Sequence, residues 1–77
     1  MIYGTQLLEA DIELFAAALS QSKVFVWSLD HQGVYYQVDY GMVDLYTPDH
    51  VKVKSLQEPN KTVLYPRESC EFSIQFN

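Results

Sequence analysis

The sequence predicts an α+β domain in which an N-terminal helix packs on a twisted antiparallel sheet of five or six short strands, curled toward a partial barrel. Apolar residues recur every three or four positions along residues 8–19, which is the period of a helix. From residue 23 onward they recur every second position, in short segments separated by turn-forming residues. Because 77 residues suit one small core, we expect residues 1–77 to form a single domain.

We expect the helix to span residues 6–20, with Thr5 as its N-cap and Glu9 near the positive end of its dipole. The residues that define its apolar stripe are Leu8, Ile12, Phe15 and Leu19. Because they share one face, they predict the side of the helix that packs on the sheet.

The first strand is predicted over residues 23–29, followed by a turn over "DHQG" and a strand over residues 34–39. Asp at the first position and Gly at the last suit a type I turn. A hairpin that this turn closes tightly pairs Trp27 with Tyr36 and places both on the apolar, inward side of the sheet. The opposite side then faces outward.

Gly41 leaves two interpretations open for residues 34–46. It is either the tip of a second tight hairpin, between strands 34–39 and 42–46, or a bulge in one long strand. We favour the hairpin, because a single strand would be about twice the usual five or six residues long. Both interpretations place the same side chains on each face.

Three further strands are predicted over residues 50–55, 62–65 and 70–76, and apolar residues alternate with polar ones within them. The side chains that we expect to point inward are those of Val51, Val53, Cys70, Phe72 and Ile74.

Charge is unevenly distributed along the chain, whose ten acids and five bases give a formal net charge of −5. Residues 1–50 contain seven acids and one base, for a charge of −6, whereas residues 51–77 contain three acids and four bases, for +1. The acidic part would repel a phosphate backbone, and the few bases would release few counterions. Direct binding of nucleic acid is therefore disfavoured.

No motif in the sequence indicates a catalytic, cofactor or metal site. The pairs Asp30-His31 and Asp49-His50 lack a third ligand, and we interpret them as turn residues. Cys70 is the only cysteine and shares the inward phase of its strand, so we expect an inert thiol in a reducing, cytoplasmic setting. No apolar run is long enough to span a bilayer, and the N-terminus does not resemble a signal peptide. We expect no enzyme, no cofactor and no membrane association.

The outward face of the predicted sheet is the candidate interaction face. Tyr and Met are common in protein interfaces, because they provide contact area at low entropic cost. The face comprises Val24, Val26, Tyr35, Gln37, Asp39, Met42, Asp44 and Tyr46. The alternative is that these residues are ordinary strand formers, or that the C-terminal segment covers them in a closed barrel. An exposed apolar patch of this size would be unusual on a monomer.

These observations predict a small, acidic protein-protein interaction module that forms a homodimer through this face or through a free sheet edge, and that binds a further, unidentified protein. Its size, charge and lack of active-site motifs are common among accessory proteins of phages and other mobile elements. One alternative is a small-molecule binder, in which Trp27, Tyr36 and Tyr40 line a cavity between helix and sheet. Another is a nucleic-acid mimic, in which acids such as Asp39 and Asp44 imitate phosphates to bind a basic protein.

Overall fold

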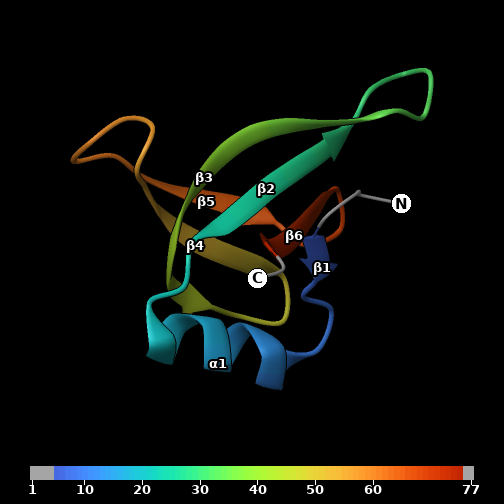
Figure 1. Cartoon of the computed structure of the whole chain (residues 1–77). Coiled ribbons are helices and arrows are strands. Elements are labelled where there is room, and N and C mark those ends of the chain that lie inside the picture. The colour runs from blue at the N-terminus through green and yellow to red at the C-terminus, as the bar shows by residue number, and fades with distance from the viewer. Residues whose placement is uncertain (1–4, 76–77) are drawn as a thin grey trace.

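The computed structural model describes residues 5–75 and confirms the predicted α+β fold (Figure 1). Among these residues, one helix accompanies a six-stranded antiparallel sheet in the order β1-β6-β2-β3-β4-β5. The elements in chain order are β1 (Thr5–Leu7), α1 (Asp11–Ser20), β2 (Val24–Leu29), β3 (Tyr35–Tyr46), β4 (His50–Ser55), β5 (Thr62–Pro66) and β6 (Cys70–Gln75). The sheet is open, with β1 and β5 at its edges, and α1 lies across one end of it (Figure 1). Residue 76, the predicted end of the last strand, lies outside the described residues.

The described part of the chain begins with a strand, β1, where the sequence predicts the first turn of the helix. Leu7 pairs with Ser73 of β6, which is a contact between segments far apart in the sequence. The helix therefore begins at Asp11 rather than at residue 6, and Thr5 lies in the strand instead of capping the helix.

Local hydrogen bonds determine where α1 begins and ends. The carboxylate Oε1 of Glu13 accepts hydrogen bonds from the backbone N–H groups of Ala10 at 2.9 Å and Glu9 at 3.0 Å. These two bonds hold the pKa of the Glu13 carboxyl below its usual range. At the other end, Gln21 adopts the left-handed conformation (φ 53°) that closes a helix.

The face that α1 buries differs from the predicted one. Leu14 and Ala17 are buried. The exposed fractions of Ile12, Phe15 and Leu19 are 70%, 47% and 75%. The prediction that these three pack on the sheet is therefore wrong. The helix is apolar on both faces, so its periodicity alone does not choose between them.

The hairpin between β2 and β3 has a three-residue loop, one residue longer than predicted. The Asp30 N–H donates to the Val34 carbonyl at 2.9 Å, and Gly33 adopts the left-handed conformation (φ 79°). A type I turn followed by a left-handed glycine forms a common three-residue hairpin loop. Leu29 therefore pairs with Tyr35, and Tyr36 pairs with Ser28 instead of Trp27. The one-residue slip turns β2 over, so Val24 and Val26 face inward in place of Phe25 and Trp27.

Gly41 lies within β3, which is one strand of 12 residues, so the favoured hairpin interpretation is wrong. Two bulges interrupt its pairing: Val38 has no partner on β2, and Asp44 has none on β4. The backbone of β4 passes close to Gly41, because a Cβ atom there would overlap the backbone carbonyl group of Lys54. Glycine at this position permits the close approach of two strands instead of turning the chain.

The core lies between the inner face of the sheet and α1. Val51, Val53 and Phe72 are buried in it as predicted, and Cys70 and Ile74 are partly buried against it. The buried apolar residues of the described chain are Leu8, Leu14, Ala17, Val24, Val26, Val43, Val51, Val53 and Phe72. Most of them are Val or Ala, so the core is built mainly from small side chains.

Candidate interaction surface

The structure does not form the predicted interaction face. Val24 and Val26 are buried because the longer hairpin loop turns their side chains inward, and Asp39 is buried because the bulge at Val38 brings it opposite Val26. The other five members differ in exposure. Three of them are partly buried, namely Tyr35, Met42 and Tyr46, and the remaining two, Gln37 and Asp44, are exposed. Tyr35 and Tyr46 lie at opposite ends of β3, so the predicted pair of outward tyrosines is not one cluster.

Asp39 belongs to a buried polar cluster instead of a surface. Its Oδ1 accepts hydrogen bonds from the Ser55 hydroxyl and the Tyr40 N–H, both at 2.8 Å. Its Oδ2 accepts a 2.6 Å hydrogen bond from the Tyr65 hydroxyl. Burial of the phenol, and then its bond to this carboxylate, raise the pKa of Tyr65. Because both carboxylate oxygens have donors, the cluster joins β3, β4 and β5 without an unsatisfied hydrogen-bond acceptor on Asp39.

The residues predicted to line a ligand cavity are also separated. Trp27 and Tyr40 flank Phe25 on the outer side of the sheet, with ring centroids 6.4 Å and 6.5 Å from that of Phe25. The Nζ atom of Lys23 lies 4.6 Å from the centre of the Tyr40 ring, a cation–π distance. Tyr36 lies further along the hairpin toward its loop and is about half exposed.

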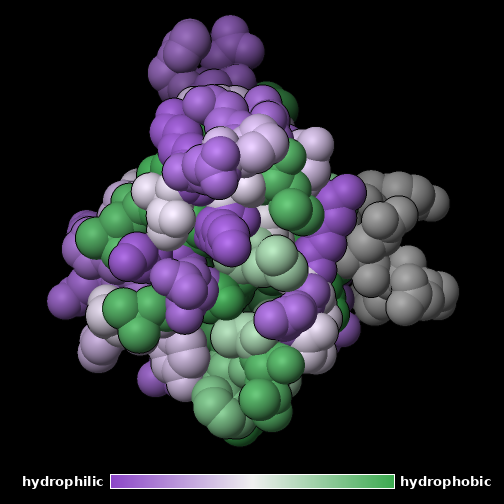
Figure 2. All heavy atoms as spheres, turned by 90° about the vertical axis from the view of Figure 1, so that its left-hand side faces the viewer, coloured by the Kyte–Doolittle hydropathy of each residue, from purple (hydrophilic) through white to green (hydrophobic). Residues whose placement is uncertain are grey.

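A different apolar surface lies where α1 meets the C-terminal end of β3. Its members are large exposed side chains, which we name together the α1–β3 surface: Ile12, Phe15, Leu19 and Leu45. It contains a groove of about 530 Å³ lined by Phe15, Ala18, Leu19, Asp44, Leu45 and Tyr46. Figure 2 shows hydrophobic surface gathered at the lower end of the molecule, where α1 lies in Figure 1.

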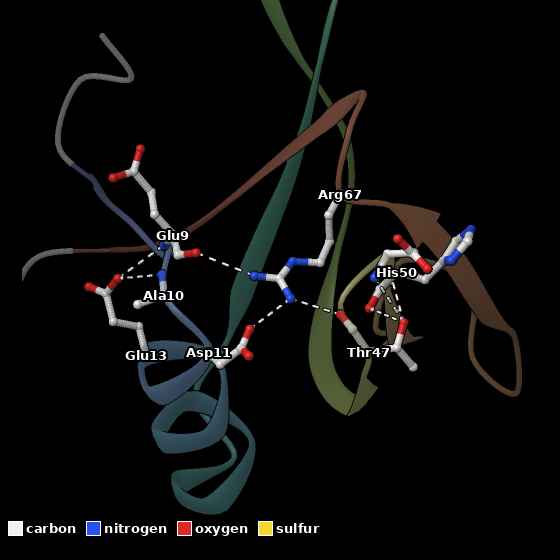
Figure 3. A network of polar contacts seen from close by, with 8 residues as sticks. Glu9, Ala10, Asp11, Glu13, Thr47, His50 and Arg67 are labelled. Carbon is white, nitrogen blue, oxygen red and sulfur yellow. Dashed lines mark hydrogen bonds and ion pairs between the residues drawn. The ribbon is translucent and has the colours of Figure 1, made fainter.

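Arg67 joins the start of α1 to the sheet beside this surface (Figure 3). It follows β5, and its Nη1 donates hydrogen bonds to Oδ1 of Asp11 and to the carbonyl oxygen of Thr47, both at 2.8 Å. Its Nη2 donates to the carbonyl oxygen of Glu9 at 3.3 Å. Asp11 and Leu14 are three residues apart and lie on neighbouring positions of one helix face. Anchoring of Asp11 therefore directs Leu14 inward and the opposite face outward.

The N-terminal end of the α1–β3 surface is acidic. Glu9, Asp11 and Glu13 are gathered at the start of α1. Arg67 pairs with Asp11 and is the base that accompanies them. Three acids against one base leave this end with an excess of negative charge.

The C-terminal end of the same surface is basic. Lys54 and Gln21 line a second hollow of about 280 Å³ beside the groove, so Lys54 lies near the end of the helix. Lys52 lies next to Asp44, with 3.9 Å between Nζ and Oδ2. Two lysines against one aspartate leave this end with an excess of positive charge.

Sequence reasoning missed the α1–β3 surface because it assigned the helical members to the core. A signal was nevertheless present, since Leu14, Ala17 and Ala18 form a second apolar stripe on the same helix. A helix that lies on one side of a sheet buries only one stripe, so two stripes indicate that one of them faces solvent or a partner.

Comparison of the chain with protein-family models, curated proteins and solved structures gives no match. Within residues 5–75, no three His, Cys, Asp or Glu side chains are grouped as ligands for a metal ion. No helix in that part of the chain is long and apolar enough to cross a membrane. Burial raises the pKa of the Cys70 thiol, which disfavours the reactive thiolate.

Proposed function

We propose that the chain is a non-enzymatic protein-interaction module whose contact surface is the α1–β3 surface. The observation that carries this proposal is the exposure of Ile12, Phe15 and Leu19 on a helix that Arg67 holds in place. Burying a side chain of this size contributes about 1.5–3 kcal/mol to stability. The core consists mainly of Val and Ala, while these larger side chains remain exposed, so the isolated chain does not gain that contribution. A partner that covers the surface would recover it.

The arrangement of residues supports this proposal. The centre of the surface is apolar and hollowed, and charged residues such as Asp44, Lys54 and Glu13 lie around it. An apolar centre within a polar rim is the usual anatomy of a protein interface. Phe15 supplies an aromatic anchor, which is a residue type that often dominates binding energy.

A location in the reducing cytoplasm is part of the proposal. Cys70 is the only cysteine of the chain, and its thiol is partly buried. A buried thiol that reacts slowly suits a protein that functions without a disulfide.

Site-specific photo-crosslinking in the cells that produce the protein tests the proposal. A photo-reactive amino acid replaces Leu19, or replaces Gln57 in the exposed β4–β5 loop as a control, which lies away from α1 in Figure 1. We expect a crosslinked product of discrete mass from position 19 and none from position 57. Equal yields from both positions, or no product from position 19, would contradict the proposal.

A further inference from the structure

We infer that the partner on the α1–β3 surface is a second copy of this chain, packed about a two-fold axis with its α1 antiparallel to the first. The inference rests on the proposed function and names the occupant of that same surface. In a two-fold interface the same residues serve on both sides, so the surface must be complementary to itself in shape and in charge.

The apolar residues of α1 are complementary in shape when two such helices run antiparallel. Ile12 and Leu19 lie seven residues apart, about 10 Å along the helix axis, and the midpoint falls between Phe15 and Ala16. A two-fold axis at that midpoint places Ile12 against Leu19 of the second copy. It also brings the Phe15 rings of the two copies together beside the axis, as an aromatic pair.

The charges at the two ends of the surface favour the same arrangement. An antiparallel pair brings the acidic end, with Glu9, toward the end of the second copy that has Lys52 and Lys54. Because the axis is two-fold, this contact between acids and lysines occurs twice in the dimer. A parallel pair would place acids against acids and align the two helix dipoles unfavourably.

The extent of the surface indicates a weak and reversible dimer. Four exposed apolar side chains form a patch within the roughly 300–600 Å² that is typical of the largest patch on a monomer. Two such patches bury roughly 1,000 Å² in total, which is the lower limit for a specific interface. We therefore expect a dissociation constant in the micromolar range.

The open edge of β5 is less suited to a second copy than the α1–β3 surface. Two backbone hydrogen bonds lie at the ends of the β4–β5 pairing. The Ser55 N–H donates to the carbonyl oxygen of Lys61, and the Arg67 N–H donates to the carbonyl oxygen of Asp49. By the alternation of an antiparallel ladder, residues 62, 64 and 66 direct their backbone groups to the open side. Residue 66 is a proline without an N–H, so the edge offers few donors for another strand.

Sedimentation velocity over about 1–500 μM protein tests the inference. We expect the mass of the wild-type chain to rise from 8.9 kDa toward twice that value. Leu19→Ser should weaken dimerisation at least about tenfold, because it removes an apolar contact on both sides of the axis. Leu29→Ser is the control, since Leu29 is another exposed leucine, at 49% against 75% for Leu19, but lies in β2 near the hairpin loop; it should leave dimerisation unchanged.

A charge exchange tests the antiparallel orientation without altering the apolar residues. Glu9→Lys alone and Lys54→Glu alone should each weaken dimerisation by about threefold or more, because each places like charges together twice. An equimolar mixture of the two variants should dimerise as well as the wild type, since every contact in the mixed dimer again joins opposite charges. If the mixture dimerises no better than either variant alone, the antiparallel arrangement is overturned.

The two proposals fail in different ways. A wild-type chain that stays monomeric throughout the concentration range, while position 19 still crosslinks to another protein, would overturn the second copy as the occupant and leave the proposed function standing. A monomer without any crosslink from position 19 would overturn both. Dimerisation that survives Leu19→Ser in a variant with native circular dichroism would also overturn the inference.

Discussion

Nη1 of Arg67 lies 2.8 Å from Oδ1 of Asp11, although 56 residues separate the two in the sequence. The side chain of Arg67 is 19% exposed and that of Asp11 is 64% exposed, so water screens the ion pair from one side. The value of the contact lies in its geometry, because the same guanidinium also binds the carbonyl oxygens of Thr47 and Glu9. One side chain thus joins the start of the helix to two loops of the sheet.

Replacing Arg67 by Ala should lower the free energy of unfolding by about 1–2 kcal/mol, because Asp11 and two carbonyl groups lose their donor. Arg67→Lys should recover only part of this loss, since an ammonium group does not present donors to three acceptors in one plane. Urea denaturation measures both changes. If Arg67→Ala is as stable as the wild type, the contact does not position α1.

Leu14→Ala should destabilise the chain by about 2–4 kcal/mol, because Leu14 is fully buried and its truncation leaves a cavity. Phe15→Ala should cost only about 1 kcal/mol, since Phe15 is about half exposed and only its partial burial is lost. Thermal denaturation at low protein concentration, where a dimer does not contribute, compares the two. The reverse order of stabilities would show that the helix buries its other face.

Gly41→Ala should cost about 3 kcal/mol or more, because the new methyl group would overlap the backbone of Lys54 and force β3 and β4 apart. Gly33→Ala is the matched comparison, since its Cβ would meet no atom within 4 Å and the cost of its positive φ is about 1 kcal/mol. Urea denaturation of both variants gives the difference. A Gly41→Ala variant that is no less stable than Gly33→Ala would contradict the close strand approach.

Stability should decline as the pH rises above about 10, which is the ordinary pKa of tyrosine in an unfolded chain. Burial and the Asp39 carboxylate raise the pKa of Tyr65 in the folded state, so the unfolded chain loses this proton first. Alkaline pH therefore favours unfolding. Tyr65→Phe removes this contribution, and its free energy of unfolding should depend less on pH above 10. Urea denaturation at several alkaline pH values measures the slopes, and equal slopes in the two proteins would refute this account.

The fold class and most strand positions follow from local patterns. Residues 50–55 form β4 as predicted, and the predicted strands at 23–29 and 62–65 differ from β2 and β5 by one residue at one end. Alternating apolar residues and flanking turn residues specify where an extended segment lies, because both signals are contained within that segment.

The orientation of these elements depends on contacts that are distant in the sequence. The rotation of α1 follows Arg67, which no helical pattern includes. β1 forms a strand because it pairs with β6. Its three residues are too few to show a strand pattern in the sequence. The inward side of β2 depends on whether Gly33 closes the turn or adds a residue to it. This loop residue and the bulge at Val38 together prevent the predicted interaction face from forming. The prediction also missed the α1–β3 surface, because it assumed the other rotation of the helix.

The length of the loop between β2 and β3 has a consequence for how this chain could change in evolution. With three residues in the loop, Val24 and Val26 are buried; with an even number, the pleat would present Phe25 and Trp27 to the interior instead. A deletion of one loop residue would thus exchange a valine core for an aromatic one, whereas a change of two residues would preserve the interior. Among related chains, the parity of this loop should therefore vary together with the side-chain volumes of both faces of β2.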